Sequence, residues 1–421
     1  MRQTKDSGIE WIGEIPENWE IGQIGHLYTE RKEKVSDKDY PPLSVTMKGI
    51  LPQLSTAAKT DAHDDRKLVK VGDFAINSRS DRRGSCGISP YDGSVSLINT
   101  ILTPRNEMNP KYYDWLFHTT MFADEFYKWG HGIVDDLWTT NWSDMKKMAV
   151  PLPPLPEQQA ISAHLDNQCA HIDNIIEKTK ASIEEYKKLR QAVITQAVTK
   201  GVRGDRAMKD SGIEWIGEIP EEWEAIKIKY ISSISRGLFN HRPRNDERYY
   251  NGEYPFIQTG DVAGATKYIT TYSQTLNDLG KEVSKEFPKG TITMTIAANI
   301  GDIAILGFDA YFPDSVVGIV PKSGILDNYL YYLLSSMKIV FIEKAVANTQ
   351  LNLNVERIKD IFVPFTNNTK EQQEIAEYLD KKCTEIDSLI TKKEQFLAEL
   401  DSYKNSLIYE YVTGKKEVPQ A

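Results

Sequence analysis

Apolar residues recur along two stretches of the chain with the alternating spacing of three and four that is typical of a coiled-coil seam. In the first stretch the seam consists of Ile161, Leu165, Cys169, Ile172, Ile176, Ile183, Tyr186 and Val193. In the second it lies 214 residues later and consists of Ile375, Leu379, Cys383, Ile386, Ile390, Leu397, Leu400 and Leu407. Thr179 and Arg190 interrupt the first seam, and Lys393 and Lys404 interrupt the second at the same slots. Matching interruptions are expected if the two helices pair with each other.

The first seam predicts one long helix from Glu157 to Val198, because the string PLPPLP at 151–156 blocks an earlier start. At 1.5 Å per residue such a helix is about 63 Å long. The second helix is expected to end near Thr413, at the string TGK. Two such helices in one chain most simply pack antiparallel and act as a spacer.

An internal repeat divides the chain into two copies of one plan. The string KDSGIEWIGEIPENWE at 5–20 recurs as KDSGIEWIGEIPEEWE at 209–224, with 15 of 16 positions identical. We call these two strings the anchors. The middle segments that follow them contain short β-branched runs separated by Gly, Asn and Asp, which indicates mixed α/β domains. Each middle segment is expected to close with one tyrosine-rich helix, over 111–128 and 328–346.

The repeat and the seams together predict four parts of the chain. The expected boundaries are 1–150 for the first α/β domain, 151–204 for the first long helix, 205–366 for the second α/β domain and 367–421 for the second long helix.

The 421-residue chain has a formal net charge of −9, which by itself speaks against a nucleic-acid-binding protein. The charge is unevenly distributed, however. Residues 21–150 hold 17 basic and 17 acidic side chains, and residues 225–370 hold 16 and 14. The acidity lies mainly in the anchors and the second long helix. The middle segments can therefore present basic faces to DNA phosphates.

Three cysteines without a CxxC pair argue against a disulfide framework and a zinc site. No apolar run approaches the length needed to span a bilayer, and the N-terminus lacks the apolar region of a secretory signal. These features predict a soluble, cytoplasmic protein without a metal.

Two arginine-rich strings stand in predicted loops of the middle segments: SRSDRR at 78–83 and SRGLFNHRPRNDER at 235–248. Arginine forks suit guanine edges and phosphates, and asparagine amides suit adenine. The candidate DNA-binding residues are Asn77, Arg79, Arg82, Arg83, Arg236, Asn240, His241, Arg242 and Arg244. Ordinary solvated loops remain the alternative explanation for both strings.

No catalytic apparatus is visible in the sequence. It lacks the phosphate-binding GxxxxGK(S/T) loop, the dinucleotide-binding GxGxxG loop and the HExxH zinc motif. It also lacks the Asn/Asp-Pro-Pro-aromatic string of amino-methyltransferases, which disfavours a standalone methyltransferase. His164 and His171 share a helix face, but the second copy has Tyr378 and Glu385 at those slots, so a metal pair is not expected.

The repeated strings resemble a known family. The anchors, DSGIEWIGEIPExWE, and the helix start PLPPLPEQQAI, with LD one turn further on, are similar to the specificity subunit of type I restriction–modification systems. The strings YPFIQTGDV at 254–262 and FPKGTI at 287–292 are similar to that family's target-recognition domains. The first copy departs from this pattern, with YPPLSVTMKGI at 40–50. The resemblance covers both halves of the chain.

The resemblance implies an α/β fold class with two target-recognition domains. These are separated by two long antiparallel coiled-coil helices, and the chain is internally duplicated with pseudo-twofold symmetry. It implies that this chain does no chemistry and that each domain binds one half of a split target in double-stranded DNA. Two methyltransferase subunits are expected to dock on the helices, and a translocating restriction subunit to join them. S-adenosylmethionine, ATP and magnesium are expected on those partners, and an adenine amine in each half-site receives the methyl group.

Two roles are open for the EQQ strings that begin the long helices. The residues concerned are Glu157, Gln158, Gln159, Glu371, Gln372 and Gln373. They are expected to act at the helix entry or at a partner face, and an equally good explanation is that the acids favour the helix dipole. For the chain as a whole, the alternative is a protein-interaction scaffold with no DNA readout. Salt-sensitive DNA binding by the assembled complex would distinguish the two.

Overall fold

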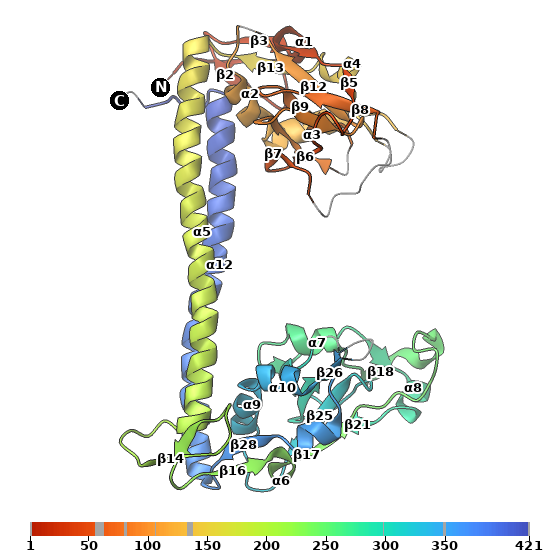
Figure 1. Cartoon of the computed structure of the whole chain (residues 1–421), viewed down its shortest axis with the longest axis vertical. Coiled ribbons are helices and arrows are strands. Elements are labelled where there is room, and N and C mark those ends of the chain that lie inside the picture. The colour runs from red at the N-terminus through yellow and green to blue at the C-terminus, as the bar shows by residue number, and fades with distance from the viewer. Residues whose placement is uncertain are drawn as a thin grey trace. The chain divides into compact units, whose positions relative to one another are not determined.

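The fold is taken from a computed structural model that describes residues 2–54, 63–79, 82–105, 107–132, 138–297, 299–347 and 351–419. The chain divides into two compact units. The first unit comprises Met1–Lys180 with Glu394–Ala421, and the second comprises Ala181–Lys393. Each unit contains one α/β domain and one part of each long helix (Figure 1). Among the described residues, no helix is both long and apolar enough to cross a membrane.

The two predicted long helices are present. Helix α5 runs from Leu155 to Lys200 and helix α12 runs from Thr369 to Val412, both without a break. Helix α5 begins two residues earlier than predicted because Pro156 lies in its first turn, where the missing N–H of proline has no intrahelical partner to lose. Helix α12 ends just before Thr413, as predicted.

Within each unit the two helices pack antiparallel along the predicted seam. In the first unit, Lys404 of α12 bonds to Asp173 of α5 at 2.6 Å. In the second unit, Arg190 of α5 bonds to Asp387 of α12 at 2.9 Å. These ion pairs occupy equivalent slots of the repeat, since both partners shift by 214 residues. Arg190 and Lys404, two of the residues that interrupt the apolar seam, therefore pair across the helices in the same register in both units.

The α/β domain of the first unit is built on a four-stranded antiparallel sheet in the order β10-β9-β12-β4. A three-stranded sheet, β11-β8-β5, and the hairpin β6-β7 complete it. The strands are β4(Tyr28–Glu30), β5(Lys34–Val35), β6(Leu43–Thr46), β7(Gly49–Pro52), β8(Arg66–Val69), β9(Phe74–Asn77), β10(Cys86–Ile88), β11(Gly93–Val95) and β12(Asn99–Pro104). Strands β3(Glu20–Gln23) and β13(Ala149–Leu152) pair beside α1(Ile24–Leu27) and α4(Trp142–Met145). Buried aromatic rings fill the core, including Phe74, Tyr112 and Phe117.

The α/β domain of the second unit is built on a five-stranded sheet in the order β17-β25-β22-β23-β19, in which only the last pair is parallel. The sheet strands are β17(Ser232–Arg236), β19(Tyr268–Ile269), β22(Ile292–Thr295), β23(Ile303–Leu306) and β25(Val316–Pro321). Among the described residues of this unit, five further pairs of strands are β14(Met208–Asp210)-β15(Glu218–Pro220), β16(Glu224–Lys227)-β28(Phe362–Phe365), β18(Tyr250–Pro255)-β20(Thr275–Leu276), β21(Glu286–Phe287)-β24(Ala310–Tyr311) and β26(Val346–Ala347)-β27(Leu351–Asn352). The short helices are α6(Ile228–Ile231), η3(Glu247–Tyr249), α7(Thr259–Gly264), α8(Asp278–Glu282) and α11(Val355–Lys359).

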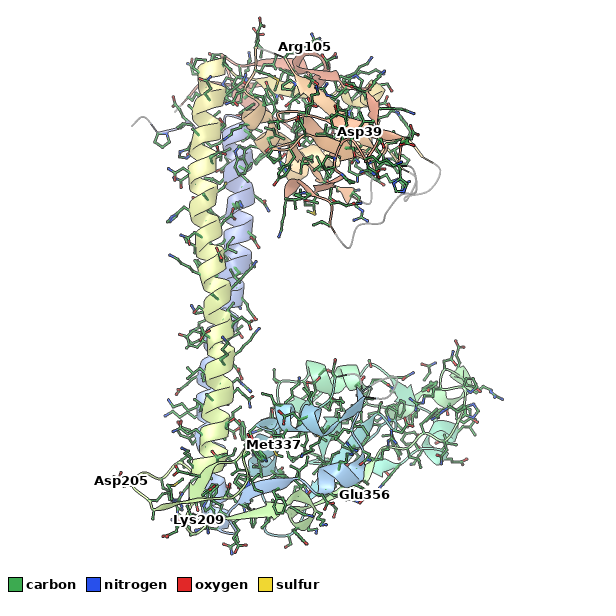
Figure 2. All side chains as sticks on the ribbon, in the orientation of Figure 1. Asp39, Arg105, Asp205, Lys209, Met337 and Glu356 are labelled. Atoms are coloured by element: carbon green, nitrogen blue, oxygen red, sulfur yellow. The ribbon has the colours of Figure 1, made fainter. Side chains whose placement is uncertain are left out.

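The tyrosine-rich segments were each predicted as one helix, and this is wrong. Each is two helices, α2(Pro110–Phe117) with α3(Thr120–Lys128) and α9(Asp327–Ser335) with α10(Lys338–Lys344). In the first unit, Thr119 breaks the helix because its hydroxyl accepts the Phe122 N–H as an N-cap. In the second unit, the break lies at Met337, which is labelled in Figure 2. Next to this break, Gln191 of α5 donates to the Ser336 carbonyl at 3.4 Å.

Both anchors fold in the same way. Each forms a hairpin, β1(Thr4–Asp6) with β2(Glu14–Pro16) in the first unit and β14(Met208–Asp210) with β15(Glu218–Pro220) in the second. Each hairpin leads to a fully buried tryptophan, Trp19 or Trp223. The first anchor packs against the end of α12, and the second packs against the end of α5.

Candidate nucleic-acid interface

Three arginines of the second unit converge on one aspartate. Arg236, at the end of β17, donates from Nε to the main-chain oxygen of Asp314, in the turn before β25. Arg242 Nη2 lies 3.5 Å from Asp314 Oδ2, and Arg244 Nη2 bonds to Asp314 Oδ1. We call these four residues the arginine cluster. Two guanidinium groups thus share the Asp314 carboxylate and a third bonds to its main-chain oxygen, which leaves the cluster with a net positive charge.

The rest of this loop is also held by internal contacts. Arg242 donates from Nη1 to the Phe239 carbonyl at 2.7 Å. His241 Nε2 lies 3.0 Å from Asp246 Oδ2, and its ring stacks on Tyr249 with the centroids 4.1 Å apart. Hydrogen bonding from Arg248 lowers the pKa of Asp246. The loop therefore presents its cations in defined positions.

Asn240 presents an exposed side chain beside the arginine cluster, while its main-chain N–H donates to the Val283 carbonyl at 3.0 Å. Of the five candidates in this string, Arg236, Arg242 and Arg244 are brought together. Asn240 and His241 lie on the same loop. Asp314 was not predicted, and no signal in the sequence marks it, because it is 70 residues from Arg244.

The candidates of the first unit lie at the end of β9. Asn77 is buried, and its Oδ1 accepts the main-chain N–H of Arg79 at 3.0 Å. Arg83 donates to Asp124 at 3.2 Å and lies 3.9 Å from the centroid of the Tyr127 ring. Arg82 joins the same turn through its main-chain N–H, which donates to the Arg79 carbonyl at 3.3 Å. Residues 80 and 81 of the SRSDRR string lie outside the described residues.

A small hollow lies beneath these residues, lined by Asn77, Arg79, Arg83, Tyr127 and Trp138 among others. Its interior volume is about 20 Å³, which is room for about one water molecule. The side chains of Arg79 and Arg83 beside this hollow are exposed.

The glutamates of the EQQ strings hold the anchors to the long helices. Glu157 accepts from Trp19 Nε1 at 2.8 Å and from the Arg2 guanidinium. Burial alone would raise the pKa of Glu157, but the hydrogen bonds from Arg2 and Trp19 outweigh it, so the pKa lies below the usual value. Glu371 makes the equivalent contacts in the second unit, with Trp223 Nε1 at 3.2 Å and Arg206 Nη1 at 2.6 Å.

The first glutamines of the EQQ strings hold the α/β domains to the long helices. Gln158 Oε1 accepts the N–H of Asn109, which caps α2, at 2.9 Å. Gln372 Oε1 accepts the N–H of Leu326, which caps α9, at 3.0 Å. Both glutamines are buried, whereas Gln159 and Gln373 are exposed. Of the three residues in each string, the last is therefore the most accessible to a partner protein.

One aspartate on each long helix completes the attachment, and the candidate residues did not include it. Asp166 accepts from Trp115 Nε1 and from Lys111 Nζ, both at 3.0 Å. Asp380 accepts from Tyr332 Oη at 2.6 Å and from Lys267 Nζ. The signal for this pair was present in the sequence, since the string LD recurs at the same slot in both helices.

One group of side chains in the first unit could suggest nucleophilic catalysis, since Cys86, His118 and Asp114 are neighbours. Burial raises the pKa of the Cys86 thiol well above its ordinary value. A thiol that stays protonated is a poor nucleophile, and His118 uses its ring nitrogens on the carbonyls of Asp114 and Cys86. Across the described parts of the chain, no three His, Cys, Asp or Glu side chains gather as metal ligands.

Sequence comparison matches both halves of the chain to one family. The profile described as "Type I restriction modification DNA specificity domain" covers residues 16–185 and 220–398. A putative type I restriction enzyme MjaX specificity subunit of Methanocaldococcus jannaschii is 25% identical over 439 aligned positions, which cover 97% of this chain and 96% of that protein. The EcoBI specificity subunit of Escherichia coli is 26% identical over 63% of this chain and 58% of its own length.

Solved structures share the fold. A chain from a study of complex assembly and conformational transition of the type I R-M system matches with a TM-score of 0.74, at 13% identity, over 96% of this chain and 99% of its own. The HsdS subunit of Thermoanaerobacter tengcongensis matches with a TM-score of 0.53, at 15% identity, over 96% and 98%. The profile covers most of this chain, with one match in each half. The chain therefore belongs to the family of type I restriction–modification DNA specificity subunits, and its two recognition domains serve sequence recognition rather than catalysis.

Proposed function

We propose that this chain reads a split target in double-stranded DNA, one half with each recognition domain, and thereby directs adenine methylation and restriction by partner subunits. The observation that carries this proposal is the contrast between its repeated and its divergent parts. The anchors and the helix entries are built from the same contacts in both units. The central sheets of the two α/β domains differ, with four antiparallel strands in the first unit and five strands, one pair of them parallel, in the second. A target with two different halves requires two different recognition domains, held by a framework that is the same in both units.

The arginine cluster supports DNA contact in the second unit. Arg242 and Arg244 are each about half exposed, so their remaining donors can reach a phosphate or a guanine edge. Arginine binds both bidentately because its donors form a rigid fork. In the first unit, Arg79 and Arg83 are exposed beyond the end of β9, a central strand of the four-stranded sheet. These two faces are our proposed DNA-contacting surfaces.

A specificity subunit works with other subunits, and we propose that two methyltransferase subunits dock on the long helices and that a restriction and translocase subunit joins them. Helix α12 carries four large apolar side chains that are 40–54% exposed, namely Tyr378, Leu389, Phe396 and Tyr403. Their spacings of eleven and seven residues place them within about 40° of one another around the helix. They lie beside the seam that pairs with α5, so α12 has a second apolar stripe suited to a partner helix.

The proposal assigns the chemistry to those partners. S-adenosylmethionine would be bound by the methyltransferase subunits, and ATP with magnesium by the restriction subunit. This chain would then contribute DNA contacts and docking surfaces alone. We place the assembled complex in the cytoplasm, with the chromosomal DNA that it would modify.

The methylome of cells tests this proposal. Cells that express this chain with its neighbouring methyltransferase should show methylated adenines in both halves of one split motif, and cells that lack only this chain should not. An Arg242→Ala/Arg244→Ala variant should lose that methylation. A matched Lys227→Ala/Lys229→Ala variant, which removes the same charge from the same unit, should keep it. If neither strain shows methylation, binding of the purified complex to duplex DNA is measured at several salt concentrations. An absence of salt-sensitive binding would refute the proposal.

A further inference from the structure

Asp314 is the only described acidic side chain that bonds to Arg242 or Arg244, and its main-chain oxygen also holds Arg236. Its own side chain is 30% exposed. A salt bridge this exposed adds little to the stability of a fold. The arrangement therefore needs another explanation than stability, and the position of these arginines on the proposed DNA-contacting surface suggests one.

The backbone around the arginine cluster is rigid. Strand β17 pairs with β25 up to Arg236 and Val317, and the next N–H, from Gly237, donates to the Val316 carbonyl at 2.9 Å. A side chain at Gly237 would overlap the carbonyl oxygens of Phe312 and Pro313. The two backbones therefore cross in direct contact, which fixes Asp314 relative to the start of the arginine loop.

The far side of the loop is held as well. Arg242 donates to the carbonyls of Phe239 and His241, at 2.7 and 2.8 Å. Tyr250, at the start of β18, donates from its hydroxyl to the Arg244 carbonyl. Between these fixed ends, the carboxylate of Asp314 is the acceptor that joins the Arg244 guanidinium to the other nitrogen of the Arg242 guanidinium.

We propose that Asp314 is a specificity-determining positioning residue of the second recognition domain. It orients Arg242 and Arg244 toward base edges, and it neutralises part of the charge that would otherwise bind any phosphate. This inference rests on the proposed DNA-reading function. Sequence-independent affinity grows with each phosphate that a cation neutralises, while discrimination is a difference between the affinities for two sequences. Asp314 lowers the sequence-independent affinity, because its charge offsets part of the arginine charge. It also raises the discrimination between sequences, because it orders the donors that contact base edges.

The test compares variants of this chain in the assembled complex with its methyltransferase subunits, by fluorescence anisotropy at several salt concentrations. The probes are a duplex with the methylated motif found in the methylome and two duplexes in which one half-site or the other is scrambled. Asp314→Asn should bind the scrambled duplexes about threefold more tightly and with a steeper salt dependence. Its discrimination should fall about tenfold at one half-site and stay unchanged at the other. Asp314→Glu, which keeps the carboxylate, should restore most of the discrimination.

Asp360→Asn is the matched control. Asp360 is 56% exposed and bridges Lys227 and Lys229 at 3.1 and 2.8 Å, so this change removes the same charge from another pair of cations in the same unit. It should leave discrimination at both half-sites intact. The inference is overturned if Asp314→Asn behaves like Asp360→Asn, or if it weakens both half-sites equally. A wild-type complex without discrimination would refute the proposed function itself, which is a distinguishable result.

Discussion

Replacing Glu371 by alanine should destabilise the packing at the start of α12, because this carboxylate accepts hydrogen bonds from three separate parts of the second unit. Its oxygens accept from Arg206 at 2.6 Å, from Trp223 at 3.2 Å and from Thr366 at 3.2 Å. The side chain is almost wholly buried, and that of Arg206 is 11% exposed. Water therefore cannot easily replace the lost carboxylate.

The expected cost follows from these contacts. Breaking a buried ion pair on one side costs about 3–5 kcal/mol, and each neutral donor left without an acceptor adds about 1 kcal/mol. Arg206 keeps its bond to Glu222 at the surface, which offsets part of this. We therefore expect a loss of about 3 kcal/mol, equivalent to about 150-fold in a local opening equilibrium. Glu371→Gln keeps one acceptor and should lose about 2 kcal/mol.

Hydrogen exchange read by mass spectrometry measures this opening segment by segment. Protection should fall in peptides covering 206–224 and 366–375 and stay unchanged in the first unit. Glu157→Ala is the matched control, because Glu157 makes the equivalent contacts but is 22% exposed, so its loss should be about 1–2 kcal/mol and confined to the first unit. The reasoning would be refuted if Glu371→Ala lowers the free energy of opening by less than about 1 kcal/mol, or if Glu157→Ala lowers it by more than Glu371→Ala does.

Three further predictions concern the helix register, the β17 crossing and acid stability. Arg190→Asp should lower the free energy of unfolding by about 1 kcal/mol, and adding Asp387→Arg should restore it in a double-mutant cycle, since the two side chains pair at 2.9 Å; a second change that restores nothing would count against a register role. Gly237→Ala should cost the second unit about 2 kcal/mol in chemical denaturation, whereas Gly260→Ala, with no atom within 4 Å of the added carbon, should cost nothing. Because the pKa of Glu157 is lowered on folding, its ionised form stabilises the first unit above the ordinary glutamate pKa, and this contribution is lost as the pH falls through the lowered value. The thermal midpoint of the first unit should therefore fall as the pH drops below the ordinary glutamate pKa, and Glu157→Gln should remove part of that fall.

Some parts of the candidate interface could be predicted from the sequence. The strings around Arg83 and Arg242 are rich in charge and punctuated by glycine or proline, which marks exposed loops, and both residues are exposed. Their partners could not be predicted. Asp124 pairs with Arg83, and Asp314 with Arg242, across 41 and 72 residues. No local pattern records a pairing at that separation.

The amino-acid sequence by itself determined the parts of this protein that repeat over short distances. The coiled-coil seam is a period of three and four residues, so the two long helices and the slots of Arg190 and Lys404 could be read directly. The duplicated anchors showed two copies of one plan, because identical strings need no structure to be recognised. The sequence pattern was misleading in the tyrosine-rich segments, where one helix was predicted and two are present. In the first unit, the N-cap at Thr119 separates the two helices.

Only the tertiary structure decided what those slots and strings do. It placed Glu371 against Trp223 and Asp380 against Tyr332, which are 148 and 48 residues apart. It also brought Asp314 to Arg236 and Arg244, because β25 pairs with β17 at the edge of the five-stranded sheet. The physical reason is that strand order and the burial of helix faces are set by how the whole chain packs its apolar surface. A side chain's partner is therefore fixed by the fold, even where its chemical type is evident from the sequence.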